Sequence, residues 1–297
     1  MGLDIKRYQE AYERVVNELK NNSRVVAIIV YGSIVSGDIW EKSDIDFLVL
    51  TNERDKAESI YTRVSGIPIH INYLSKDIFV KSCQNLLKGG TFHKAFFTGK
   101  LVFSRDGYLD DVYLSTRFYG DRDRSIRNVE ILCNLLNGMH YTEKYYITGK
   151  LETSYQWCME LLKNYARLLM NINGHITDND ILSYAVNMND EVKYLFNVLT
   201  GSNSLDVRIK EVLEFVNRFL QINLRTIAMP VIEFLKERKT AVSIGDMKNS
   251  GWFKHVDGDL SLLMDELSNH GIINEGTRKY TTYGDEHLIN EIVYSIK

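Results

Sequence analysis

Two short apolar runs separated by a Gly-Ser pair constrain the fold of this chain more than any other feature. Residues 25–31, Val-Val-Ala-Ile-Ile-Val-Tyr, form a short run rich in β-branched side chains, which is typical of a buried strand. Gly32-Ser33 follows directly, and glycine allows a tight turn in which the backbone approaches a ligand closely. A second apolar run begins at Ile45. The sequence therefore predicts a strand, a turn that can face a ligand, and a second strand.

Two carboxylates stand at the start of the second run. Because side chains alternate along a strand, Asp44 and Asp46 lie on one face, and Ile45 and Phe47 lie on the other. Neighbouring carboxylates repel each other, and a divalent cation bound by both is the usual reason for such a pair. We therefore expect a metal ion at Asp44 and Asp46.

The order of these residues resembles the signature of a known superfamily. Gly32-Ser33, Gly37 and Ser43-Asp44-Ile45-Asp46, followed by Phe-Leu-Val-Leu, are similar to the signature of the nucleotidyltransferases. This superfamily has the polymerase-β-like fold and includes aminoglycoside and lincosamide adenylyltransferases and the minimal nucleotidyltransferases. Strand, turn, spacer and paired-acid strand occur in order, which is more specific than an Asp-x-Asp motif alone. The resemblance covers about the first third of the chain.

The resemblance implies a site for a nucleoside triphosphate, with ATP as the expected substrate. In the family the paired acids hold a divalent metal that bridges the phosphates, so Asp44 and Asp46 are the expected ligands of Mg²⁺ or Mn²⁺. Gly32 and Ser33 would offer backbone N–H groups, a hydroxyl and a helix N-terminus to the triphosphate. Lys42 and Lys163 either meet phosphate or remain solvated surface lysines. The expected nucleotide-binding residues are Gly32, Ser33, Lys42 and Ser43.

One departure from the family concerns the third carboxylate, which an adjacent strand usually supplies as a metal ligand or base. The counterpart here is the run 67–73, whose polar face carries His70 and Asn72 and no acid. His70 completes the expected catalytic set with Asp44 and Asp46, since a neutral imidazole accepts protons near pH 7 and favours Mn²⁺ over Mg²⁺. Alternatively, His70 is an ordinary strand histidine in a site without catalysis. Asp38, Glu41 or an acid of the helical region are further candidates.

Composition is that of an ordinary soluble protein, with 44% hydrophobic and 25% charged residues among 297. The net charge of −3 gives no general attraction to nucleic acid. Cys83, Cys133 and Cys158 form no Cys-x-x-Cys pair and are expected to be buried thiols in a reducing compartment. Neither a signal peptide nor an apolar run of membrane-spanning length is found. These features predict a cytoplasmic protein that does not contact membranes.

The predicted fold class is an α/β nucleotidyltransferase fold, with a mixed sheet and flanking helices, followed by an all-α bundle and a small winged-helix-like α+β domain. The expected domains are 1–115, 116–229 and 230–297, since helical patterns without proline replace mixed elements after the first boundary. Within the first domain, residues 55–64 are expected to be a short helix. Within the third, a β-hairpin is expected to turn at Glu275-Gly276.

The third domain raises the alternative of a DNA-binding regulator. Its expected recognition helix covers residues 259–270. The span 255–270 has no Lys or Arg and carries four acidic side chains, so its charge has the wrong sign for DNA. Only Arg278 and Lys279 on the wing are favourable, which makes a packing module or a homodimer contact the preferred interpretation. The predicted function is metal-dependent transfer of a nucleoside monophosphate to a hydroxyl acceptor on a small molecule or protein. The alternative is a catalytically weakened protein that binds nucleotide for regulation.

Overall fold

The computed structural model describes residues 4–53, 57–85, 97–176, 180–281 and 287–297. The chain divides into two compact units, residues 1–119 and 120–297. The first unit ends close to the predicted boundary at residue 115. The second predicted boundary, between residues 229 and 230, falls inside the second unit at the first turn of a helix.

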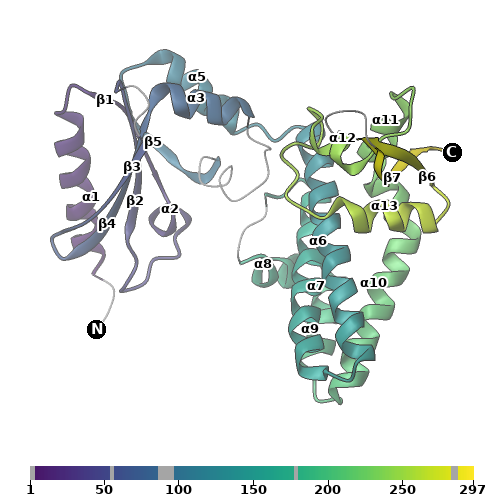
Figure 1. Ribbon diagram of the computed structural model, residues 1–297. Helices are drawn as coiled ribbons and strands as arrows, with labels where there is room; N and C mark the ends of the chain where they lie inside the picture. Colours follow the sequence, from purple (N-terminus) through teal and green to yellow (C-terminus); the bar gives the residue numbers. More distant parts are fainter. Residues whose placement is uncertain (1–3, 54–56, 86–96, 177–179, 282–286) are drawn as a thin grey trace. The chain divides into compact units, whose positions relative to one another are not determined.

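The first unit is built on a five-stranded mixed sheet with the strand order β3-β4-β2-β1-β5 (Figure 1). Strands β2 and β4 are parallel, and the other neighbouring pairs are antiparallel. Six of the seven β1 residues are buried, as expected for a central strand covered on both faces. The strands are β1 (Val25–Tyr31), β2 (Ile45–Thr51), β3 (Ala57–Val64), β4 (Ile67–Ser75) and β5 (Lys100–Ser104).

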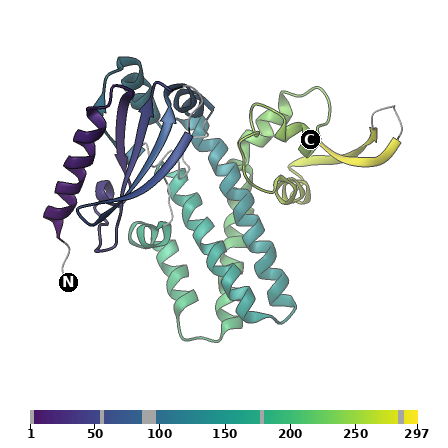
Figure 2. The same cartoon turned by 60° about the vertical axis from the view of Figure 1, so that its left-hand side comes forward.

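Helices cover both faces of this sheet (Figures 1 and 2). Helix α1 (Ile5–Lys20) packs its apolar side against one face, where Ile28, Phe47 and Ile69 belong to the same core. Helices α3 (Lys76–Asn85) and α5 (Gly107–Thr116) cover the other face through a second core that includes Ile29 and Leu48. This arrangement confirms the predicted mixed sheet with flanking helices.

The segment predicted as a helix over residues 55–64 is instead a strand, and that prediction is wrong for the described residues from Ala57 onward. Strand β3 pairs with β4 along its whole length. Ser65 and Gly66 join the two strands with φ angles of 51° and 79°, the left-handed conformation that two-residue hairpin loops require. Pairing with β4 outweighs the local helical preference of this polar, exposed segment.

The second unit begins with an all-helical region in which α6, α7 and α10 run side by side (Figures 1 and 2). A Cβ on Gly138 of α6 would lie 3.2 Å from Leu161 Cα on α7, so glycine permits the close approach of these two helices. Cys133 and Cys158 are buried, while Cys83 in the first unit is half-buried. The helices are α6 (Asp121–Ile147), α7 (Leu151–Ile172), α8 (Ile181–Met188), α9 (Asp190–Thr200) and α10 (Leu205–Ile227).

Three short helices and a two-stranded sheet complete the second unit. Glu275 and Gly276 lie inside β6, so the predicted hairpin turn at that position is wrong; the β6–β7 connection falls at residues 282–286, outside the described residues. Gly276 pairs with Val293 within the strand, and a Cβ at this position would meet no atom within 4 Å. Figure 2 shows the two strands extending away from the helices. The elements are α11 (Met229–Lys236), α12 (Ile244–Lys248), α13 (Leu260–Asn269), β6 (Ile273–Thr281) and β7 (His287–Ile296).

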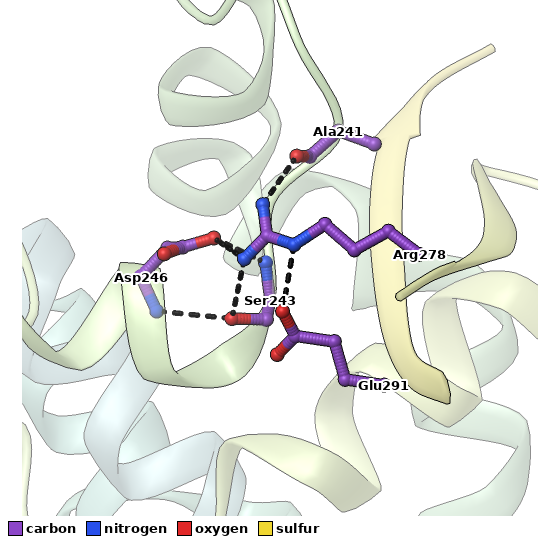
Figure 3. Close-up of polar contacts among 5 residues, drawn as sticks. All are labelled: Ala241, Ser243, Asp246, Arg278 and Glu291. Atoms are coloured by element: carbon purple, nitrogen blue, oxygen red, sulfur yellow. Dashed lines mark hydrogen bonds and ion pairs between the residues drawn. The ribbon is translucent and has the colours of Figure 1, made fainter. Parts of the chain in front are cut away.

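Arg278 joins this sheet to α12 (Figure 3). Its guanidinium donates to Asp246 Oδ2 at 2.7 Å and to Glu291 Oε1 at 2.6 Å. Asp246 also closes a capping box with Ser243 at the start of α12. Arg278 is one of the two basic residues expected to favour nucleic acid, and here two carboxylates neutralise it. No helix in the described part of the chain is long and apolar enough to cross a membrane.

Candidate functional site

The predicted turn at Gly32-Ser33 lies at the end of β1 and begins the one-turn helix α2 (Ser33–Ser36). Gly32 has a φ of 78°, a conformation that other L-residues rarely adopt. A Cβ at Gly32 would lie less than 3.0 Å from Asp46 Oδ2. Only glycine therefore lets the turn and the acidic strand meet. Helix α2 is a single turn, so it has no long helix dipole to attract an anion. The turn offers an anion its backbone N–H groups instead.

Asp46 is the second residue of β2 and lies between Tyr31 on β1 and His70 on β4 in the strand register. Its side chain is 20% exposed. Burial raises the pKa of Asp46, the nearby Asp44 charge raises it further, and His70 opposes both effects. The folded protein thus holds a carboxylate that is disfavoured by its surroundings, and a bound cation would relieve this cost.

The loop that leads into Asp44 is fixed from α1. Tyr8 Oη shares its one proton between the carbonyl oxygens of Ser43, at 2.7 Å, and Trp40, at 3.1 Å. Ser43 is buried, and its hydroxyl accepts from the Trp40 N–H at 3.1 Å. Lys42 is exposed, with its ammonium 5.6 Å from the centre of the Trp40 ring. Ser43 therefore shapes the loop, and Tyr8 is a supporting residue that the sequence did not reveal.

Strand β4 presents His70 and Asn72 on its polar face, as the alternation predicts. His70 Nδ1 lies 3.4 Å from Asp46 Oδ1, and His70 Nε2 lies 2.7 Å from Ser59 Oγ on β3. Ser59 donates to Asn72 Oδ1 at 2.9 Å, and Asn72 Nδ2 donates to Tyr31 Oη at 2.8 Å. A chain of polar contacts thus crosses four strands. Sequence reasoning missed Ser59, because its segment was assigned to a helix, and Tyr31, because it closes an apolar run.

The donor set suits a divalent cation held jointly with phosphate. Asp44 and Asp46 supply carboxylate oxygens, and Mg²⁺ is commonly bound by one or two carboxylates together with substrate phosphates. Among the described residues, no group of three or more His, Cys, Asp or Glu side chains forms a ready-made metal site. Phosphate oxygens would therefore have to complete the coordination.

The other candidate groups are occupied elsewhere or exposed. Asp38 is exposed and accepts from Ser36 Oγ at 2.9 Å, and Glu41 is also exposed. Lys163 belongs to α7 of the second unit and pairs with Glu160 at 2.6 Å. His70 on β4 is the residue that lies directly opposite Asp46 in the strand register.

Comparison with known proteins identifies this arrangement. Residues 13–108 match the family model described as polymerase beta, nucleotidyltransferase. The chain contains a nucleotidyltransferase domain. The matched segment includes Gly32, Ser33, Asp44, Asp46 and His70, and confirms the superfamily that the sequence signature implied.

The fold similarity extends beyond the nucleotidyltransferase domain. The crystal structure of a nucleotidyltransferase-like protein from Exiguobacterium sibiricum matches this chain with a TM-score of 0.71, and the two sequences are 17% identical. The similarity covers 97% of this chain and 99% of that chain. The shared fold thus includes the helical region and the small C-terminal sheet. A search of curated proteins found no match.

Proposed function

We propose that the first unit transfers a nucleoside monophosphate from a nucleoside triphosphate, with ATP as the expected donor, to an acceptor hydroxyl on a small molecule or protein. Asp44 and Asp46 would hold Mg²⁺ or Mn²⁺. The observation that carries this proposal is the close approach of Gly32 to Asp46, which puts a partly exposed backbone turn beside a half-buried carboxylate. A triphosphate bound at the turn would therefore meet the metal ligands directly.

Each residue contributes to positioning and charge rather than to covalent chemistry. When bound, a divalent cation neutralises phosphate charge and aligns the attacking and leaving oxygens. Gly32 and Ser33 orient the phosphates through the backbone. The reduced solvent access of Asp46 strengthens its interaction with a cation. Tyr8 fixes the loop that carries Asp44.

A second candidate is a nucleotide-binding regulatory protein without transfer activity. It is favoured by one observation, which is that His70 takes the place facing Asp46 where an acid would be expected. Both candidates require nucleotide and metal to bind at Asp44 and Asp46, so they differ only in turnover.

Calorimetric titration with ATP, in Mg²⁺, Mn²⁺ or EDTA, tests both candidates. The wild type should bind ATP only with metal, and the Asp44→Asn/Asp46→Asn variant should lose this binding. Asp38→Asn removes a nearby exposed acid and is the matched control, which should bind as the wild type does. Absence of metal-dependent binding in the wild type would sink both candidates.

Transfer itself is measured by incubating the protein with α-phosphate-labelled ATP and mixtures of hydroxyl-bearing small molecules or proteins. Label that moves to an acceptor in the wild type but not in the double variant supports the enzyme. Binding without transfer across a broad set of acceptors favours the regulatory candidate.

A further inference from the structure

The hydrogen bonds that link His70, Ser59, Asn72 and Tyr31 run in one direction from donor to acceptor. An amide oxygen only accepts hydrogen bonds, an amide nitrogen only donates them, and a hydroxyl has one proton to give. Asn72 turns its Nδ2 to Tyr31, so its Oδ1 faces Ser59 and accepts that hydroxyl proton at 2.9 Å. The Ser59 oxygen is then left as an acceptor for its other neighbour.

That neighbour is His70 Nε2, which lies 2.7 Å from Ser59 Oγ. Since Ser59 gives its proton to Asn72, the proton of this second hydrogen bond must belong to His70 Nε2. A neutral imidazole that is protonated at Nε2 carries its lone pair on Nδ1. His70 Nδ1 is the atom that faces Asp46 Oδ1 at 3.4 Å. In the neutral imidazole a lone pair thus faces a carboxylate, an unfavourable contact that either a cation bound by both atoms or a second proton on the ring would relieve.

The separation of these two atoms fits a shared ion. Two donors that bind one ion at about 2.1–2.2 Å and subtend roughly a right angle or slightly more lie about 3.0–3.5 Å apart. A histidine ligand almost always donates its other ring N–H to a fixed partner, which sets the tautomer. Ser59 holds that position here. The parallel register of β2 and β4 keeps His70 beside Asp46.

We propose that His70 is a metal ligand through Nδ1, beside Asp46, and that Ser59 and Asn72 are positioning residues that hold it in this tautomer. This inference rests on the proposed function, because it takes Asp46 as a metal ligand. It replaces the missing carboxylate with a nitrogen. Nitrogen ligands suit Mn²⁺ better than Mg²⁺, so the site should prefer Mn²⁺.

The same heavy atoms allow two competing arrangements. In the first, His70 carries a proton on both ring nitrogens, and Nδ1–H donates to Asp46 Oδ1. In the second, the Asn72 amide is reversed, protons run from Tyr31 towards His70, and Nδ1–H again donates to Asp46. In both, His70 would anchor a ligand without binding metal itself. Measurement of the nitrogen bound to the ion distinguishes the proposed arrangement from these two.

Pulsed electron paramagnetic resonance of Mn²⁺ with ATP on the full chain gives that measurement. Uniform ¹⁵N labelling of the protein separates its nitrogen couplings from those of the nucleotide. We expect a directly bound ¹⁵N in the wild type and its loss in His70→Asp. Bound Mn²⁺ that depends on Asp46 but shows no such coupling would overturn this inference and leave the proposed function standing. Failure of Mn²⁺ and ATP to bind, or binding unaffected by Asp46→Asn, would overturn both.

The positioning residues are tested by the ratio of Mn²⁺ to Mg²⁺ affinity, measured by competition. Ser59→Ala should lower Mn²⁺ affinity about tenfold or more, as loss of such a partner typically does, with a much smaller change for Mg²⁺. Ser59→Thr keeps the hydroxyl and should restore the ratio. A purely structural role would lower both affinities together. An unchanged ratio in Ser59→Ala, with the fold verified by circular dichroism, would contradict the role of Ser59.

Discussion

Gly32 and Asp46 are packed so closely that any side chain at position 32 would collide with the Asp46 carboxylate. The ideal Cβ position is less than 3.0 Å from Oδ2 and 3.3 Å from Cγ of Asp46. A side chain at position 32 would therefore displace the acid from the turn.

We expect Gly32→Ala to weaken metal-dependent ATP binding at least tenfold, because the added methyl group must push Asp46 away. Gly37→Ala is the matched control. Gly37 also has a positive φ, of 88°, but a Cβ there meets nothing within 4 Å. It should lose stability by about 1–3 kcal/mol from backbone strain alone while keeping ATP binding. Calorimetry and urea unfolding measure the two effects. Equal loss of binding in both variants would refute the steric explanation.

Asp46→Asn should stabilise the metal-free protein at neutral pH. Burial, and then the Asp44 charge, raise the pKa of Asp46 above its usual value of 3.8, so the folded state binds this proton more tightly than the unfolded state does. The wild type therefore loses stability as pH rises through the interval between the usual and the raised value. Urea unfolding in EDTA at pH 3 and pH 7 should show a gain for Asp46→Asn at pH 7 only. A gain of equal size at both pH values would contradict the prediction.

The buried ion pair of α6 should be sensitive to loss of one partner. Glu130 is 6% exposed, and its Oε2 lies 2.6 Å from Arg127 Nη1. Arg127→Met leaves a buried carboxylate unpaired and should cost roughly 3–5 kcal/mol, whereas Arg127→Met/Glu130→Met should recover most of this loss. The exposed pair Arg14–Glu18 is the control, and Arg14→Met should cost less than about 1 kcal/mol. A double variant as unstable as the single one would show that packing, not the unpaired charge, dominates.

Arg278→Met should loosen the C-terminal sheet without affecting nucleotide binding in the first unit. The Arg278 side chain is 43% exposed, so solvent screening limits the expected loss to about 1 kcal/mol, and high salt should reduce it further. Lys279→Met on the same strand is the control and should be neutral. Because two carboxylates occupy Arg278, we also expect no salt-dependent binding of random duplex DNA. A shift at low salt that Arg278→Met abolishes would contradict this view.

The central part of the site could be predicted because its signals are local. The β-branched run, the Gly-Ser turn and the paired acids are contiguous in sequence, and the alternation from Ile67 to Asn72 correctly placed His70 on the polar face. A buried strand must be apolar, and a crowded turn must be glycine, so these requirements are visible in the residues themselves.

The supporting residues could not be predicted, because they depend on pairing between distant segments. Strand β3 is exposed on both faces, so no hydrophobic period marks it, and only the Ser65-Gly66 turn signals a hairpin. Ser59 was missed for this reason. Glycine is frequent in turns, so the sequence pattern favours a turn at Gly276. Pairing with β7 instead keeps this part of β6 extended. Tyr8 reaches Ser43 across 35 positions of sequence, a contact that no local pattern contains.

The parallel register of β2 and β4 has a further consequence for how this protein can diverge. Whatever side chain occupies position 70 faces Asp46, while the turn and both acids come from a separate segment, residues 32–46. A histidine codon becomes an aspartate codon by a change of its first base. One mutational step therefore exchanges an imidazole nitrogen for a carboxylate oxygen beside Asp46 and leaves the Gly32-Ser33 turn intact. If position 70 binds the ion as we propose, descendants of this gene would change their ion preference without rebuilding the fold.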